Sequence, residues 1–227
     1  MNKFRTFNPD LIVEVTGVCD RACAGCYAPN LISQFTPEEL FLTKPEMFLT
    51  TKQLTTTLTE LKSKAESIAL RGGEPSRHPF LTDLLDVAHK YSRNVFVETH
   101  GRWILNKTES AHIIQTCAKL GTVLKISFDR MHGLSADELL AITNRLTQGS
   151  VDWVIAITEI NENEFTMTRN LCDWIPTEKI IYQKKASSLH DLIEPRIGVI
   201  KLNGNLSRTL TTKKDFVLKP IFAGLAT

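Results

Sequence analysis

The alternation of short apolar runs with helical segments limits the folds open to this chain more than any other feature of its sequence. Runs typical of buried strands cover Leu11–Thr16, Ser67–Arg71, Asn94–Glu98, Thr122–Phe128, Val151–Thr158 and Lys179–Gln183. The segments between them are long enough for helices, which favours parallel strands joined by right-handed crossovers. The pattern therefore predicts an α/β fold, either an open doubly wound sheet or a partial (β/α)6 barrel, and does not choose between them.

Helical periodicity in the connections supports this alternation. Apolar stripes predict helices over Leu54–Ala65, Leu81–Ala88, Ile113–Leu120 and Leu139–Leu146, and a further helix capped near Asn161–Glu164 and ending near Trp174. Capping signals mark several ends: Thr50 or Thr51 as an N-cap, Ser135 with Glu138 as a capping box, and Gly121 as a C-cap. The connections thus contain the start and stop signals that helices need.

Two stretches depart from the alternation. Residues 28–49 contain three prolines, and we expect either a short helix around Pro37 or a covering loop there. Near the C-terminus, Asn203-Gly204 lies between two apolar runs, which is a strong signal for a hairpin with a type I′ turn. We expect this hairpin to be a two-stranded appendage on the last edge of the sheet.

Length and composition limit the domain organisation and the function class. With 227 residues the chain can bury one substantial core, so we predict a single domain over 1–227. Its core covers about 9–185, and a hairpin and tail cover about 195–227. A net charge of +2 with scattered basic residues gives no strong signal for nucleic acid. The absence of a long apolar run and of a signal-peptide core predicts a cytoplasmic protein that does not bind membranes.

The cysteines indicate a metal site. Cys19, Cys23 and Cys26 lie in the loop after the first strand, and such clustering is not typical of a disulfide framework in a chain of this length. Three thiolates on a [4Fe–4S] cluster would leave one iron open to another ligand. Zinc would need a fourth ligand, and no His or Cys lies within a few residues of the trio. Cys117 and Cys172 fall on apolar helical faces, where a buried structural cysteine is the simpler interpretation.

Polar and glycine-rich segments follow three of the predicted strands. These segments are Gly72–Pro75, Thr99–Gly101 and Ser127–Asp129. The carboxyl ends of parallel strands meet at one edge of a sheet or barrel, so we expect the segments to converge with the cysteine loop on one rim. His132 follows shortly after and is a candidate for a substrate role. Glu98 lies inside an apolar strand and needs a partner or a role in the site if it is buried.

Together these motifs resemble those of the radical S-adenosylmethionine superfamily. The resemblance rests on Cys19-x3-Cys23-x2-Cys26 and on Gly72-Gly-Glu-Pro75, and covers roughly residues 9–185. Thr99–Gly101 and Ile126–Asp129 are similar to the third- and fourth-strand signatures of the branch that contains the molybdopterin cyclase and the peptide maturases. The resemblance implies a partial (β/α)6 barrel that binds one [4Fe–4S] cluster and S-adenosylmethionine.

The resemblance also implies roles for individual residues. Cys19, Cys23 and Cys26 would bind three irons, and S-adenosylmethionine would bind the fourth. Residues implied to contact the cosubstrate are Gly72, Gly73 and Glu74 at its methionine end, Ser127 and Asp129 at the ribose, and Thr99 and His100 elsewhere on the rim. The family usually carries an aromatic residue just before the third cysteine, whereas this chain has Gly25 there and Tyr27 after it. Tyr27 is therefore our candidate for the adenine contact.

The implied activity is radical chemistry. An electron from a flavodoxin- or ferredoxin-like donor would cleave S-adenosylmethionine, and the resulting 5′-deoxyadenosyl radical would abstract hydrogen from a substrate. A small metabolite, a nucleoside and a peptide all fit as substrates. The two remaining cysteines cannot supply a second four-cysteine cluster, so we expect one oxygen-sensitive cluster. The open alternatives are a glycyl-radical-type activating enzyme, a zinc-binding or non-catalytic scaffold, and a sensor of redox state or S-adenosylmethionine.

Overall fold

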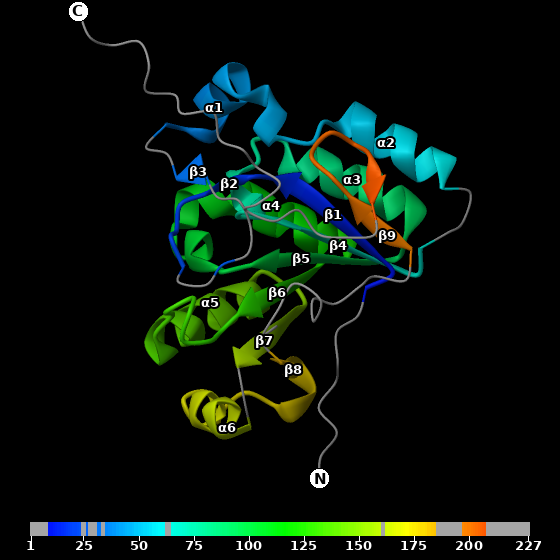
Figure 1. Ribbon diagram of the computed structural model, residues 1–227. Helices are drawn as coiled ribbons and strands as arrows, with labels where there is room; N and C mark the ends of the chain where they lie inside the picture. The colour runs from blue at the N-terminus through cyan, green and yellow to red at the C-terminus, as the bar shows by residue number, and fades with distance from the viewer. Residues whose placement is uncertain are drawn as a thin grey trace, which may run out of the picture.

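The computed structural model describes residues 9–23, 26, 31–32, 35–61, 65–159, 162–184 and 197–207 (Figure 1). Six parallel strands lie side by side in its main sheet in the order in which they occur in the chain. They are β1 (Leu11–Thr16), β4 (Ser67–Gly72), β5 (Asn94–Thr99), β6 (Val123–Ser127), β7 (Trp153–Glu159) and β8 (Ile180–Lys184). This sequential order confirms the partial (β/α)6 barrel, and in the described chain the sheet does not close.

The predicted helices lie between these strands. They are α1 (Pro37–Thr43), α2 (Thr51–Glu60), α3 (Leu81–Tyr91), α4 (Lys107–Leu120), α5 (Ala136–Gln148) and α6 (Glu162–Asn170). Thr50 caps α2 in a capping box with Gln53, and Gly121 ends α4 in the left-handed conformation. The last helix ends at Asn170 rather than near Trp174. No helix in the described part of the chain is long and apolar enough to cross a membrane.

The stretch 28–49 contains a helix, one of the two alternatives expected from its sequence. Helix α1 starts at a capping box between Thr36 and Glu39, and a 3-10 turn, η1 (Pro45–Met47), follows it. Leu40 and Met47 pack with Val18 in a small separate core beside the start of the cysteine loop. Here two short strands, β2 (Val18–Cys19) and β3 (Leu31–Ile32), pair in parallel. This segment therefore supports the chain just before the first cysteine.

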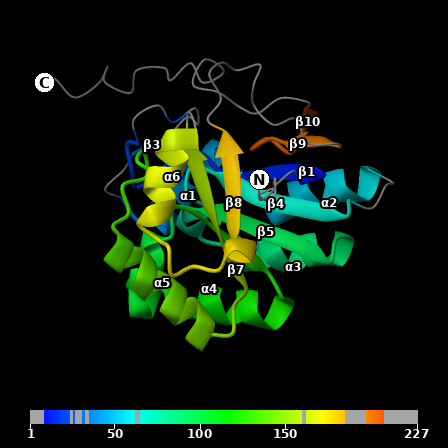
Figure 2. The ribbon, with the colours of Figure 1, turned by 90° about the horizontal axis from the view of Figure 1, so that it is seen from below.

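The main core fills the space between the sheet and its outer helices. Figure 2 shows helices α2 to α5 on one side of the curved sheet. Alternate strand residues such as Val13, Leu70 and Val97 point into this layer and are almost fully buried, as is Leu84 of α3. The other strand residues therefore lie on the inner face of the barrel. That face carries a smaller apolar cluster around Ala69 and charged residues near the carboxyl ends of the strands.

The C-terminal hairpin is confirmed, but its position and turn differ from the expectation. Strands β9 (Gly198–Ile200) and β10 (Leu206–Ser207) are antiparallel, and β9 pairs with β1 at the first edge of the barrel rather than the last. In the turn, the N–H of Gly204 donates to the carbonyl of Lys201, and Gly204 has a φ of 83°. Asn203 lacks the positive φ that a type I′ turn requires, so this is a longer, bulged connection. The tail beyond residue 207 lies outside the described residues.

Candidate functional site

A cavity of about 100 Å³ lies where β4, β5 and β6 end beneath the cysteine loop. Its lining combines most of the predicted site residues with Glu98, which the sequence indicated as needing a partner or a role in the site, and with Arg71, which no motif indicated. The full lining is Cys19, Cys23, Cys26, Arg71, Gly72, Gly73, Glu74, Glu98, Thr99, His100, Ser127 and His132. The segments expected to converge on one rim therefore do so. Gly25 and Tyr27 lie outside the described residues, so the adenine contact stays a prediction.

The three clustered cysteines differ in exposure. Cys19 ends β2 and is 6% exposed, whereas Cys23 and Cys26 are partly buried and joined by a backbone hydrogen bond of 3.2 Å. Burial raises the pKa of the Cys19 thiol to about 12, so a thiolate at this position needs a cation beside it. Cys117 and Cys172 are fully buried and do not line the cavity. The trio thus has the chemistry of metal ligands, and the other pair that of core residues.

Gly72 and Gly73 allow β4 to end against the chain that leads to Cys19. A Cβ atom on Gly72, which has a φ of 152°, would lie 2.2 Å from the carbonyl oxygen of Thr16. A Cβ on Gly73 would lie 2.2 Å from the carbonyl oxygen of Val18. Backbone hydrogen bonds of 2.7 and 2.8 Å join these same segments. The missing side chains therefore let the end of β4 pack against the backbone that leads to Cys19, and the implied contact of Gly72 and Gly73 with the cosubstrate stays a prediction.

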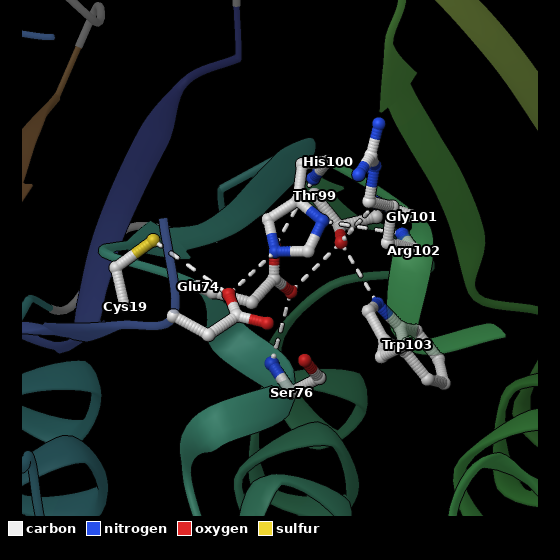
Figure 3. A network of polar contacts seen from close by, with 9 residues as sticks. Cys19, Glu74, Ser76, Thr99, His100, Gly101, Arg102 and Trp103 are labelled. Carbon is white, nitrogen blue, oxygen red and sulfur yellow. Dashed lines mark hydrogen bonds and ion pairs between the residues drawn. The ribbon is translucent and has the colours of Figure 1, made fainter. Parts of the chain in front are cut away.

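Glu74 is the centre of a buried hydrogen-bond network (Figure 3). Its side chain is 1% exposed. Its Oε1 accepts from the hydroxyl of Thr99 at 2.7 Å and from the N–H of Ser76 at 3.1 Å. Its Oε2 accepts from the N–H of His100 at 3.1 Å. Thr99 in turn accepts from the indole N–H of Trp103 at 2.8 Å. Trp103 has no motif around it in the sequence, and it enters the site only through the 3-10 turn η3 (Arg102–Leu105) after β5.

His100 connects Glu74 to the cysteine loop. Its Nδ1 accepts the backbone N–H of Arg102 at 3.1 Å, so Nε2 is the nitrogen that carries the hydrogen in the neutral ring. Nε2 lies 2.9 Å from Oδ1 of Asp20 and 3.2 Å from Oε2 of Glu74. The hydrogen bond from His100 lowers the pKa of Asp20, the residue next to Cys19. The imidazole therefore donates its N–H to Asp20 of the cysteine loop and lies beside the Glu74 carboxylate.

This tautomer argues against zinc at the one compact ligand group in the described part of the chain. Ligand atoms of Cys19, Asp20 and His100 lie within 4.8 Å of one another. A metal-bound imidazole usually donates the N–H of its other nitrogen to an acceptor. In His100 the other nitrogen faces the Arg102 N–H, a donor, so metal binding at Nε2 would break that hydrogen bond. The group is thus better explained as a hydrogen-bond network than as a metal site.

Ser127 and Asp129, both implied to contact the ribose, differ in their position relative to the cavity. Strand β6 ends at Ser127, which lines the cavity. Asp129 follows in a turn where strand alternation no longer applies, and it does not line the cavity. Its Oδ1 accepts the backbone N–H groups of Met131 and His132 at 2.9 and 3.0 Å, and it also contacts the imidazole of His132. Asp129 therefore shapes the turn that brings His132 to the cavity.

Three charged side chains on neighbouring strands lie below the rim. Oε2 of Glu98 on β5 is 3.8 Å from Nη1 of Arg71 on β4 and 3.3 Å from Nζ of Lys125 on β6. Burial opposes the charged form of Glu98, but the two cations outweigh it and lower the pKa of this carboxyl. These ion pairs supply the partners that Glu98 needs inside an apolar strand. The register that places the three side by side is a property of the sheet and not of any local motif.

A second hollow, of about 450 Å³, lies outside the cysteine loop. It is lined by Asp20, Arg21, Ala22, Cys23, Arg102 and Met131. Cys23 borders this hollow and the inner cavity. The cysteine loop is therefore accessible from two sides. The inner cavity is lined by acidic, polar and glycine residues, and the outer hollow contains two arginines.

Comparisons with known proteins give a likeness of fold. No protein-family model matches the chain, and no curated protein matches it by sequence. SuiB from Streptococcus suis, in a crystal structure with the precursor peptide SuiA, matches with a TM-score of 0.58 and 14% identity, over 86% of this chain and 44% of SuiB. Native anSMEcpe with bound AdoMet matches with a TM-score of 0.54 and 13% identity, over 80% of this chain and 53% of anSMEcpe.

A further structure of native anSMEcpe, with bound AdoMet and a Cp18Cys peptide, gives a TM-score of 0.53 and 14% identity over 80% of this chain and 52% of that protein. The chain thus spans about half the length of these proteins. The chain shares the fold of SuiB and anSMEcpe, which is the fold that its resemblance to the radical S-adenosylmethionine superfamily implies.

Proposed function

We propose that the chain is a radical S-adenosylmethionine enzyme. In this proposal it cleaves S-adenosylmethionine reductively to a 5′-deoxyadenosyl radical, which abstracts hydrogen from a substrate. The observation that carries the proposal is the cavity on which Cys19, Cys23 and Cys26 converge with Gly72, Gly73 and Glu74. Fold likeness to a protein solved with bound AdoMet supports it. The chain is then a cytoplasmic enzyme, in keeping with its free thiols.

The donor set fits one [4Fe–4S] cluster. Three thiols border the cavity, and the two other cysteines are buried elsewhere. When bound, such a cluster supplies the electron for the cleavage. The residues of this chain position the reactants: the buried Glu74 network fixes the end of β4 and, through His100, the cysteine loop. Ser127 lies at the cavity with a hydroxyl that can bond to a ribose.

The outer hollow is the side from which an electron donor can reach the cluster. Cys23 borders it together with Arg21 and Arg102. A flavodoxin- or ferredoxin-like donor with an acidic surface fits these charges. For the substrate, a small metabolite, a nucleoside and a peptide all agree with the residues. Fold likeness to proteins solved with bound peptides favours the peptide among them.

Anaerobic reconstitution tests the proposed function. We expect about four irons per chain, a broad visible absorption, and 5′-deoxyadenosine after addition of S-adenosylmethionine and dithionite. Cys23→Ala should abolish all three. Cys117→Ala is the matched control, because it removes a buried thiol that does not line the cavity, and it should retain the cluster. Stoichiometric zinc without iron, or equal loss of iron in both variants, would reject the proposal.

A further inference from the structure

The Asp129–His132 pair gives the cavity a histidine with a defined tautomer. Nδ1 of His132 lies 2.8 Å from both carboxylate oxygens of Asp129. The Asp129 side chain is fully buried, and its Oδ1 also accepts two backbone N–H groups in the same turn. A carboxylate in this position accepts hydrogen bonds only, so Nδ1 is the nitrogen that carries the hydrogen. In the neutral imidazole the lone pair is therefore on Nε2.

Nε2 of His132 is available to a ligand. Within the described ranges no residue makes a hydrogen bond or an ion pair with this nitrogen. The His132 side chain is 26% exposed and lines the cavity together with Cys19, Cys23 and Cys26. His100, on the same cavity, has the opposite arrangement, because its Nδ1 accepts an N–H and its Nε2 faces two carboxylates. Of these two imidazoles, only His132 has in its neutral form an acceptor nitrogen that is not already bonded to a described residue.

The Asp129–His132 arrangement is the one that metal-binding histidines use. A ligating imidazole usually donates its second N–H to a carboxylate or carbonyl, which fixes the ring and makes the ligating nitrogen more basic. The turn itself does not need the imidazole, because the backbone N–H groups of Met131 and His132 already bond to Asp129. The contact between the His132 ring and the buried Asp129 carboxylate is therefore not needed to shape the backbone. Its effect is to orient Nε2 of His132.

We propose that Nε2 of His132 is the protein's fourth metal ligand, completing a Cys3His set with the three cysteines. The inference rests on the proposed function as follows: His132 binds the fourth iron of the cluster while S-adenosylmethionine is absent, and the cosubstrate displaces it. The step is a ligand exchange, in which one iron–nitrogen bond breaks as the amino and carboxylate groups of the cosubstrate bind. The neutral imidazole neither gains nor loses a proton or an electron. The ligand atoms of these four residues do not all lie within 4.8 Å of one another, so a single zinc ion would take the same Cys3His set only after the cysteine loop moved, and the test includes both metals.

Magnetic resonance of the reconstituted protein tests the iron arm. With ¹⁵N-labelled histidine, the dithionite-reduced cluster should show hyperfine coupling to one imidazole nitrogen in pulsed EPR. The coupling should disappear when S-adenosylmethionine is added, and it should be absent in His132→Ala. His112→Ala is the matched control, because His112 is exposed on α4 and should keep the coupling. A wild-type cluster without imidazole coupling, or a coupling that persists in His132→Ala, would overturn the assignment for the cluster.

Zinc titration separates failure of this inference from failure of the proposed function. If the chain takes up zinc and no cluster, the radical enzyme is rejected, but His132→Ala should still weaken zinc binding by about tenfold or more. Asp129→Asn should weaken it about 10- to 100-fold by releasing the ring from its tautomer. Thermal unfolding of each metal-free variant checks that it folds. Equal zinc affinity in wild type and His132→Ala, with no imidazole coupling on a cluster, would exclude His132 as a ligand of either metal.

Discussion

The hydroxyl of Thr99 donates a hydrogen bond of 2.7 Å to Oε1 of Glu74, across two strand ends that are 25 residues apart in the chain. The same hydroxyl oxygen accepts N–H groups from Gly101 at 3.0 Å and from Trp103 at 2.8 Å. Thr99 is 3% exposed, so water has little access to its hydroxyl. One side chain thus satisfies a buried carboxylate and two donors at the rim of the barrel.

Substitutions of Thr99 should separate the effect of its hydroxyl from that of its shape. Thr99→Val keeps the shape and leaves the Glu74 oxygen and two N–H groups with one partner fewer, so unfolding should become easier by about 2–3 kcal/mol. Thr99→Ser keeps the hydroxyl and loses one methyl group, which should cost about 1 kcal/mol. Urea unfolding of the metal-free, reduced protein measures both. Equal losses in the two variants would mean that packing, and not hydrogen bonding, is what Thr99 contributes.

The ion pairs of Glu98 make a second prediction. Lys125 is 3% exposed, and burial lowers its pKa whereas the Glu98 carboxylate raises it. Glu98→Gln should therefore destabilise the fold by about 3–5 kcal/mol. The double variant Glu98→Gln with Lys125→Met should lose less than the sum of the two single losses, because the buried cation is gone as well. Urea unfolding of the four proteins in this cycle gives the coupling energy.

The exposed pair Lys179–Asp152 is the control for that cycle. Its atoms are 3.2 Å apart, close to the Lys125–Glu98 distance, but the Asp152 side chain is 74% exposed. Asp152→Asn should change stability by less than about 1 kcal/mol. A Glu98→Gln loss as small as that of Asp152→Asn would contradict a dependence of Lys125 on this carboxylate.

Much of the fold could be predicted because its signals are local. The run Leu11–Thr16 is β1 residue for residue, and the capping box at Ser135 and Glu138 opens α5 as expected. The choice of a barrel came from the resemblance, since alternation alone does not say in which order the strands lie. For the same reason, local signals could not predict which edge of the sheet the C-terminal hairpin joins. It follows from β9 returning to pair with β1 over a separation of more than 180 residues.

Within the site, the sequence identified residue types at strand ends but not the contacts between them. Convergence of the cysteine loop with Gly72–Glu74 follows from parallel strands, and the structure has it. The separation of Ser127 from Asp129 depends on where β6 ends, and strand ends are poorly marked in sequence. The roles of Arg71 and Lys125 depend on strand register. The tautomers of His100 and His132 depend on single backbone or side-chain partners, which no spacing rule encodes.

Gly73 provides a prediction about the junction of β4 and the cysteine loop. A Cβ at Gly73 would lie 2.2 Å from the Val18 carbonyl oxygen, and backbone cannot move aside as a flexible side chain can. Gly73→Ala should cost about 3 kcal/mol or more and reduce the metal content of reconstituted protein. Gly121→Ala is the control, because Gly121 has a φ of 73° and no atom within 4 Å of an added Cβ. Gly121→Ala should cost about 1–2 kcal/mol and leave the metal content unchanged. A larger loss of stability in Gly121→Ala than in Gly73→Ala would refute the clash at Gly73.

His78 should make stability depend on pH. It is 3% exposed, its Nε2 lies 2.9 Å from the Leu49 carbonyl oxygen and its Nδ1 accepts the Phe80 N–H, an arrangement that fits the neutral ring. Burial lowers the pKa of His78 from 6.5 to about 4, so between these values the unfolded chain binds a proton that the folded chain does not. Stability should fall by about 3 kcal/mol as the pH drops from 6.5 to 4, and this contribution is complete above pH 6.5.

His78→Gln should lower stability at neutral pH and remove that part of the slope, whereas exposed His112→Gln should not. Urea unfolding across this range measures the slopes, and parallel curves for wild type and His78→Gln would show that the ring is not held neutral.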